Sequence, residues 1–125
     1  MHKTKWRLVF GAMSVLLASV MPAKSNGWPN RPIVLVVPFG PGGAPDIIAR
    51  FLAQELSEKL NQRVLVENRP GNSGNIGAMA VARSAPDGHM LLLGTPNPIA
   101  LNKMIQGATQ GFDPDKDLRP ISILG

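Results

Sequence analysis

The chain has 125 residues, no cysteine and a formal net charge of +5 at neutral pH. That length accommodates one small domain with a single core, and the lack of cysteine excludes disulfides and thiolate chemistry. Four of the thirteen basic residues lie in the first 24 positions, and from Trp28 onward nine Lys and Arg stand against eight Asp and Glu, a net charge of +1 that argues against nucleic-acid binding.

The first 27 residues have the composition of a secretory signal peptide. Basic residues precede an apolar run from Leu8 to Val20, and Pro22 and small residues follow it. As a helix this run spans roughly 20 Å, less than the roughly 30 Å hydrocarbon core of a membrane. We therefore expect residues 1–27 to be a signal peptide, cleaved near 25–27, and the mature protein to be periplasmic. An uncleaved membrane anchor is the alternative.

The mature chain begins with a predicted strand and a predicted helix. A continuous β-branched and apolar run from Ile33 to Val37, bounded by prolines, predicts a strand buried on both faces. A loop rich in Gly and Pro follows, and Pro45 and Asp46 suit the first turn of a helix that extends to Leu60. One apolar stripe of this helix is expected to face the core: Ile47, Ile48, Phe51, Leu52, Leu56 and Leu60.

Further short elements alternate along the rest of the chain. Strands are predicted at 64–66 and 90–93, a small-residue helix at 76–84, helical turns at 99–105, a polar loop at 111–119, and the beginning of a fourth strand at 121–124. Strand, helix, strand, helix, strand at this spacing is the sequence of a right-handed parallel α/β sheet. The chain stops inside its last predicted element, which is typical of a truncated protein.

Three loops follow the predicted strands, at the sheet edge where open α/β sheets bind ligands. They cover 39–46, 68–75 and 94–98, are rich in Gly, Asn and Pro, and carry little charge. We expect the Gly42-Gly43 pair to take positive φ and to let the backbone approach a ligand, while the helix start offers free N–H groups. Such a site suits a carboxylate or phosphate held by neutral dipoles. The alternative is that these glycines only form tight turns.

Patterns for nucleotide, metal and acid–base chemistry are incomplete. The Walker pattern lacks its Lys and Ser or Thr, and the dinucleotide fingerprint requires Gly where Pro45 stands. Asp113, Asp115 and Asp117 lack the Gly and distal Glu of a calcium loop, so we expect a solvated acidic turn. His89 is expected to be an exposed turn residue rather than a base. We expect no enzyme activity, no cofactor and no metal; a phosphate- or nucleotide-binding enzyme domain is the alternative function.

Seven short motifs follow one another from Trp28 to the end of the chain. They are Trp28-Pro29-Asn30-Arg31-Pro32-Ile33; Val37-Pro38-Phe39 leading through Gly42-Gly43 to Asp46; Val66-Glu67-Asn68-Arg69-Pro70-Gly71; Gly74-Asn75-Ile76-Gly77; Ala85-Pro86-Asp87-Gly88; Gly94-Thr95; and Phe112-Asp113-Pro114 with Lys116-Asp117 and Pro120. In order and spacing they resemble the Bug-type receptors, the extracytoplasmic solute-binding proteins of tripartite tricarboxylate transporters. Pro96 and Pro98 depart from the family pattern and stiffen the loop after Gly94.

The resemblance implies the parallel-sheet lobe of a two-domain, Venus-flytrap (type II-like) periplasmic-binding-protein fold. Residues 28–125 would form the N-terminal α/β part of its first domain, and the second lobe would be absent. The implied ligand is a small carboxylate (a tricarboxylate, a dicarboxylate or a related organic acid), and the implied partners are the membrane permease subunits of such a transporter. The implied ligand contacts are Phe39, Gly42, Gly43, Ala44, Asp46, Asn75, Gly77, Gly94, Thr95 and Asn97.

Overall fold

A parallel sheet of three strands, in the order β2-β1-β3, forms the centre of the protein. The computed structural model describes residues 27–124, so the predicted signal peptide lies outside the described residues except for Gly27. The strands are β1 (Ile33–Val37), β2 (Val64–Asn68) and β3 (Met90–Leu92). Among residues 27–124 there is no helix with the length and hydropathy needed to span a membrane.

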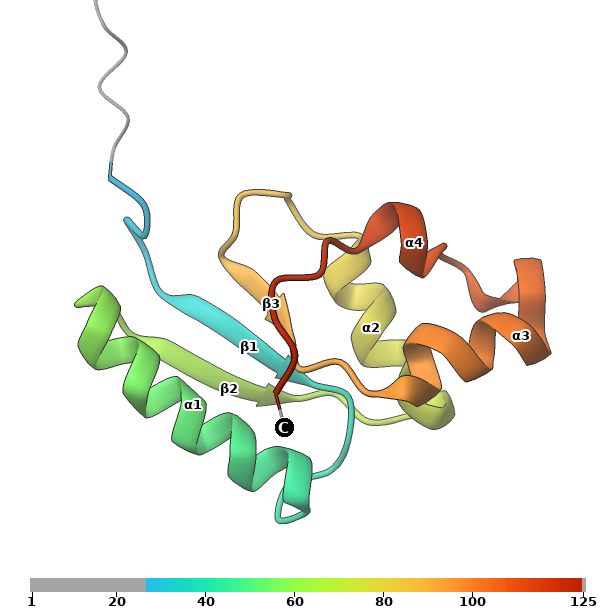
Figure 1. Ribbon diagram of the computed structural model, residues 1–125, viewed down its shortest axis with the longest axis horizontal. Helices are drawn as coiled ribbons and strands as arrows, with labels where there is room; N and C mark the ends of the chain where they lie inside the picture. Colours follow the sequence, from blue (N-terminus) through green and yellow to red (C-terminus); the bar gives the residue numbers. More distant parts are fainter. Residues whose placement is uncertain (1–26, 125) are drawn as a thin grey trace, which may run out of the picture.

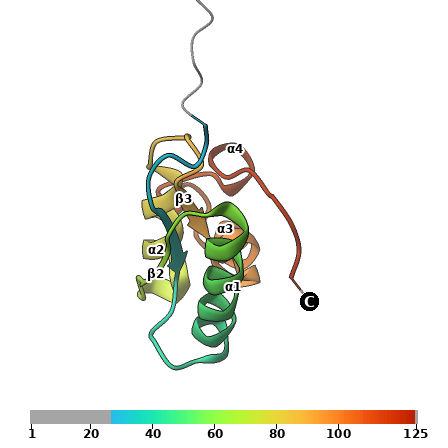
Figure 2. The same ribbon diagram turned by 90° about the vertical axis from the view of Figure 1, so that its left-hand side faces the viewer.

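Two helices cover the two faces of the sheet. Helix α1 (Ala44–Leu60) connects β1 to β2, and α2 (Asn75–Ala82) connects β2 to β3 after a short 3₁₀ turn, η1 (Asn72–Gly74). They lie on opposite sides of the strands (Figures 1 and 2). Right-handed crossovers that leave the sheet in opposite directions place their helices on opposite faces. The predicted parallel α/β architecture is confirmed.

Short helical segments follow β3. They are a π-helical turn η2 (Asn97–Leu101), α3 (Asn102–Gln106), a 3₁₀ turn η3 (Gly107–Gln110) and α4 (Pro114–Asp117). The helical turns predicted at 99–105 are confirmed. Helix α4 falls inside the predicted polar loop, and it forms because the Asp113 side chain accepts a hydrogen bond from Asp115 N and so caps the helix, with Pro114 in the first turn.

The fourth strand predicted at 121–124 is wrong for this structure. The segment joins no strand ladder, and Ile121 and Ile123 are 78% and 92% exposed. It lies on the same side of the sheet as α1 and farther from the strands, not alongside β3 (Figures 1 and 2). A β-branched run is a strand only when a neighbouring strand pairs with it, and no strand among residues 27–124 does so.

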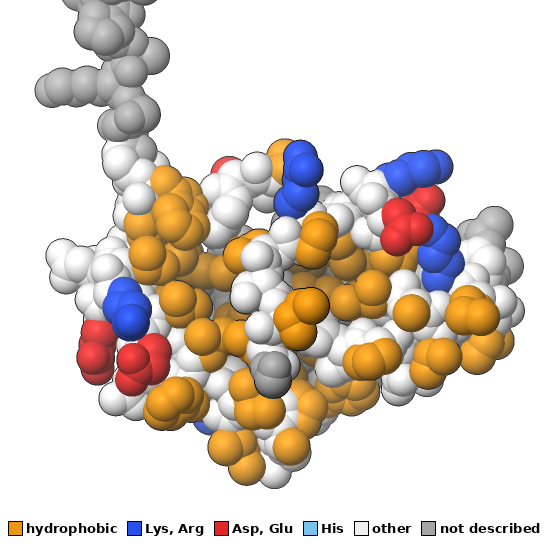
Figure 3. All heavy atoms as spheres, in the orientation of Figure 1, with side chains coloured by type: hydrophobic (Ala, Val, Ile, Leu, Met, Phe, Trp, Pro, Cys, Tyr) orange, Lys and Arg blue, Asp and Glu red, His pale blue; other side chains and the backbone are white. Residues whose placement is uncertain are grey.

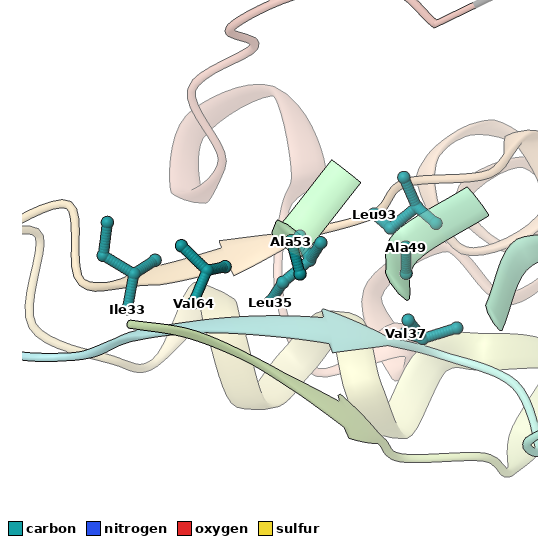
Figure 4. Close-up of a cluster of buried hydrophobic side chains, with 7 residues drawn as sticks. All are labelled: Ile33, Leu35, Val37, Ala49, Ala53, Val64 and Leu93. Carbon is teal, nitrogen blue, oxygen red and sulfur yellow. The ribbon is translucent and has the colours of Figure 1, made fainter. Parts of the chain in front are cut away.

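The core between α1 and the sheet depends on small residues of the helix. Ile33, Leu35 and Val37 of β1 point toward Ala49 and Ala53 of α1, as Figure 4 shows together with Val64 and Leu93. Both alanines are 5% exposed or less. Alanine lets the helix axis approach the strands closely, so Leu52, Leu56 and Leu60 are only partly buried at the margins of the contact.

The outer side of α1 corrects part of the predicted apolar stripe. Ile47, Ile48 and Phe51 are 63%, 50% and 69% exposed, so the prediction that they face the core is wrong. At 100° per residue, Ile47 and Phe51 lie across the helix from Ala49 and Ala53. The six predicted residues form an arc too wide to bury on one sheet face. Apolar side chains consequently crowd the surface on which α1 and the C-terminal residues lie (Figure 3).

Helix α2 packs against the other face of the sheet through its smallest residues. Ala78 and Val36 of β1 are fully buried. A Cβ atom at Gly77 would lie 2.9 Å from the carbonyl oxygen of Arg69 and 3.0 Å from Pro38 Cα, both backbone atoms. Gly77 therefore sets how closely α2 approaches the end of β1.

Gly77→Ala is expected to destabilise the protein. The added methyl group would clash with backbone that cannot rotate away, and overpacking of this kind costs about 1–3 kcal/mol. Urea denaturation measures the change. Gly40→Ala is the matched control, because no atom lies within 4 Å of its added methyl group. Equal free energies of unfolding for the two variants would contradict this account of α2 packing.

Candidate functional site

The three loops expected to bind ligand all lie at the carboxyl edge of the sheet. Strand β1 pairs in parallel with both β2 and β3, so all three strands end on the same side. Because β1 is central, the loop after it lies between the other two. A Cβ atom at Gly74, in the second loop, would lie 3.3 Å from Cβ of Pro38, which leads from β1 into the first loop, and 3.3 Å from Pro98 Cγ in the third. The loops therefore meet at Gly74.

The loop after β1 presents backbone rather than side chains. Residues 40–44 are all exposed, and no atom lies within 4 Å of a Cβ placed at Gly42. Gly42 has φ +87°, the positive φ expected of it. Gly43 is the N-cap of α1 with φ −83° and ψ 169°, so the expectation of positive φ at Gly43 is wrong. Its extended backbone leads directly into the helix.

Two N–H groups at the start of α1 lack a close protein acceptor. Gly42 N donates to the Asp46 carboxylate at 2.9 Å, and Asp46 N donates to Gly43 O at 3.0 Å. Within residues 27–124 the N–H groups of Gly43 and Ala44 form no close hydrogen bond, and both residues are exposed. These groups stand at the positive end of the dipole of a 17-residue helix, where an anion is stabilised.

Asp46 is enclosed by the loop instead of being open to a ligand. Its side chain is 4% exposed. One carboxylate oxygen accepts from Arg50 Nε at 3.0 Å and from Gly42 N at 2.9 Å, and the other accepts from Asn68 Nδ2 at 3.0 Å. These hydrogen bonds, among which that from Arg50 has the largest effect, lower the pKa of the Asp46 carboxyl to about 2. The carboxylate therefore braces the backbone of the first loop.

Asn68 connects the first loop to the second. It is the last residue of β2, and its Nδ2 donates to Phe39 O at 3.1 Å as well as to Asp46. Phe39 is half-buried against the core, so its side chain is held by packing and its carbonyl by Asn68. Sequence reasoning did not include Asn68 among the site residues. Its position at the carboxyl end of a strand was the available signal.

The predicted site residues Asn75 and Gly77, at the start of α2, are buried. Asn75 is 4% exposed and its Nδ2 donates to Gln110 O at 2.8 Å. Gly77 lies beneath it against Pro38 and the Arg69 carbonyl. The structure brings both residues to the shared edge, but places them under its surface.

The third loop returns to the surface. Gly94 and Asn97 are exposed, and Thr95 is half-buried. The Thr95 hydroxyl is buried and has no partner among the described residues, so it retains a donor and two acceptor positions. Phe39, Gly42, Gly43 and Ala44 thus lie on one loop of this edge, and Gly94, Thr95 and Asn97 on the other.

Cations described near this edge are already paired. Arg50 contacts Asp46 at 3.0 Å, and Arg69 contacts Glu67 at 2.7 Å. The exposed groups that remain for an anion are main-chain N–H groups, since the Thr95 hydroxyl, although without a partner among the described residues, is buried. The site built from neutral dipoles stays a prediction.

His89 lies outside the site, but the expectation that it is exposed is wrong. It is 5% exposed, and its ring packs edge-on against Trp28 with the centroids 6.0 Å apart. It precedes β3 and so lies at the amino end of that strand, away from the loops. The N-terminal segment covers it, and the sequence alone gave no sign of this long-range contact.

The acidic residues of 113–117 belong to a small charged cluster beside α4. Lys103 contacts Asp113 at 2.8 Å and also Asp115, and Asp113 N donates to Asp117 at 2.7 Å. Ion pairing and helix capping therefore account for the three carboxylates. Among the described residues no group of three or more His, Cys, Asp or Glu is placed to hold a metal ion.

Comparison with known proteins shows the family to which the chain belongs. Residues 48–125 match the profile of the family described as tripartite tricarboxylate transporter family receptor. The chain belongs to this receptor family. BugT of Bordetella pertussis is 37% identical over 126 residues, which cover 100% of this chain and 38% of BugT. The chain thus spans well under half the length of the curated relatives it matches.

Solved structures of similar proteins share the fold. A protein of R. palustris, solved with adipate, is 44% identical with a TM-score of 0.65 over 70% of this chain and 29% of that one. MatC of Rhodopseudomonas palustris, with bound malate, is 36% identical with a TM-score of 0.65 over 71% of this chain and 30% of MatC. The described sheet and helices therefore have the fold of the receptor family. Its similar solved structures include the periplasmic binding protein BugD.

Asp46→Asn is expected to lower the melting temperature by several degrees at neutral pH, because the amide cannot accept all three hydrogen bonds. The pKa of Asp46 is about 2 in the folded protein against an ordinary 3.8. Since the folded pKa is lower, the stabilisation is fully present above about pH 4 and is lost as the pH falls toward about 2.

Melting curves of both proteins between about pH 7 and pH 2.5 test this. The difference in melting temperature should narrow as the pH falls. Glu58→Gln, on the exposed side of α1, serves as control and should leave the melting temperature nearly unchanged. A wild-type advantage over Asp46→Asn that is the same at all pH values would contradict the bracing role.

Proposed function

We propose that this protein captures a small carboxylate outside the cytoplasmic membrane, as the ligand-contacting part of a periplasmic receptor. Family membership supports a receptor rather than an enzyme, and the neighbours solved with adipate and malate support a dicarboxylate ligand. Residues 1–27 act as the signal peptide for export. The membrane subunits of a tripartite tricarboxylate transporter receive the ligand.

The observation that carries this proposal is the exposed pair of N–H groups at Gly43 and Ala44. They form no close hydrogen bond within residues 27–124, stand at the positive end of α1, and belong to exposed residues. A carboxylate oxygen readily accepts hydrogen bonds from two such N–H groups, and its negative charge is stabilised by the positive end of the helix dipole.

The predicted site residues divide into two roles. Contacts to the ligand come from the exposed or half-buried loop residues: Phe39, Gly42, Gly43, Ala44, Gly94, Thr95 and Asn97. The buried residues Asp46, Asn75 and Gly77 hold these loops in place, because their polar atoms and surfaces are used within the protein. Ordered water between the loops and the carboxylate would extend the contacts at little cost in affinity.

A second lobe closes over the ligand in the proposed receptor. The relatives are more than twice as long as this chain, and the carboxyl edge described here is an open surface. A cleft between two lobes would remove the carboxylate from water and so strengthen its hydrogen bonds to the loop amides.

Gly43→Val tests the anion site without straining the backbone. At φ −83° and ψ 169° valine is sterically permitted, but its side chain would stand where the carboxylate meets the two N–H groups. Loss of one charge-assisted hydrogen bond, about 1.5–3 kcal/mol, predicts affinity weaker by roughly 10- to 150-fold. Calorimetry with adipate and malate measures it.

Arg63→Val is the control for that experiment, because Arg63 is exposed and precedes β2 at the opposite edge of the sheet. Its affinity should equal that of the wild type. Unchanged binding in Gly43→Val, with an unaltered melting curve, would place the ligand elsewhere on the protein.

A further inference from the structure

A buried glutamine far along the chain links two of the ligand loops. Gln110 ends η3 and is 2% exposed. Its side-chain Nε2 donates to Pro98 O at 2.6 Å, and its own main-chain oxygen accepts from Asn75 Nδ2 at 2.8 Å. One residue thus holds the third loop through its side chain and the second loop through its backbone.

The contact with Pro98 bears directly on loop position. Pro98 is fully buried, and a Cβ atom at Gly74 would lie 3.3 Å from its ring. Gly74 has φ +89°, and with no side chain of its own it allows Pro98 and Pro38 to close on it from both sides. A displacement of Pro98 would therefore move the point at which all three loops meet.

Because the hydrogen bond from Gln110 to Pro98 is buried, water cannot take the place of the Gln110 amide. A carbonyl oxygen enclosed by protein cannot exchange a lost partner for bulk water, so the Gln110 amide fixes where Pro98 lies. Thr95 and Asn97 precede Pro98 on the same short loop. Their orientation toward the edge then depends on a residue that contacts neither of them in the described hydrogen bonds.

We propose that Gln110 is a positioning residue of the carboxylate site, which holds the loop of Gly94–Pro98 against the start of α2. This inference rests on the proposed function for its effect on affinity, but its effect on the loop does not require a ligand. No motif in the sequence marks Gln110.

Gln110→Met tests the link while conserving side-chain length and volume. Methionine cannot donate to Pro98 O, whereas the main-chain bond from Asn75 remains possible. Hydrogen exchange of the ligand-free protein should become about tenfold faster at amides of 95–102 and stay unchanged in β1 and α1. Gln54→Met, the same change at an exposed position of α1, should alter neither region.

Ligand affinity distinguishes a positioning role from a purely structural one, because only loss of positioning would change the affinity of the folded protein. Measured well below the melting temperature, the affinity of Gln110→Met for adipate or malate should fall about 5- to 30-fold, and that of Gln54→Met should not change. A purely structural residue would lower the melting temperature and leave the affinity of the folded protein unaltered.

A second variant covers the case in which Gln110→Met does not fold. In Gln110→Glu the carboxyl group can donate to Pro98 O only when it is protonated. Relative to the wild type at the same pH, exchange of 95–102 should be fast near neutral pH and slow again on acidification.

The outcomes separate this inference from the proposed function. Local exchange that matches the wild type in these variants would overturn the positioning role, whether or not a carboxylate binds. Faster local exchange in a protein that binds neither adipate nor malate would uphold the role in the loop and contradict the proposed ligand class.

Discussion

The buried carboxylate of Asp46 is the interaction on which the site depends. It accepts hydrogen bonds from Gly42 N, Arg50 and Asn68, and Asn68 in turn holds Phe39 O. Glycine-rich loops have high conformational entropy, so an exposed loop of this composition needs a strong local constraint to hold one shape. Because the Asp46 side chain is occupied in this way, the amides of Gly43 and Ala44 are left facing outward. In the proposed function, the negative charge of Asp46 inside the loop thus shapes a site for the negative charge of a ligand outside it.

Neutral groups also connect the loops across the rest of the carboxyl edge. Two side-chain amides, the half-buried one of Asn68 and the buried one of Gln110, connect the three loops, and proline rings converge on Gly74. Rigid neutral dipoles can hold a carboxylate without the desolvation cost of burying a lysine or arginine. A site of this kind discriminates among acids by the spacing and shape of its loops. In this chain Pro96 and Pro98 restrict the backbone of the third loop.

The sequence predicted the fold well wherever local pattern decides it. Strand β1 covers the predicted apolar run Ile33–Val37, which prolines bound on both sides. Helix α1 begins with Pro45 in its first turn, as predicted. It failed where distant residues decide. Ala49 and Ala53, not Ile47 and Phe51, meet the sheet; Trp28 buries His89; and residues 121–124 have no strand to pair with among those described. The loop glycines could be located from the sequence, but the bracing by Asn68 and Gln110 arises from contacts across 22 and 12 residues that no local pattern encodes.

Amide chemical shifts in ¹⁵N-labelled protein, followed during titration with malate and with adipate, test the central claim most directly. If the carboxylate is held by the start of α1 and the loop after β3, the largest changes will be at Gly43, Ala44, Thr95 and Asn97. The amides of 62–64 and 87–90, at the opposite edge of the sheet, will change little. Saturable shifts confined to that opposite edge, or to the charged cluster around Lys103, would contradict the account.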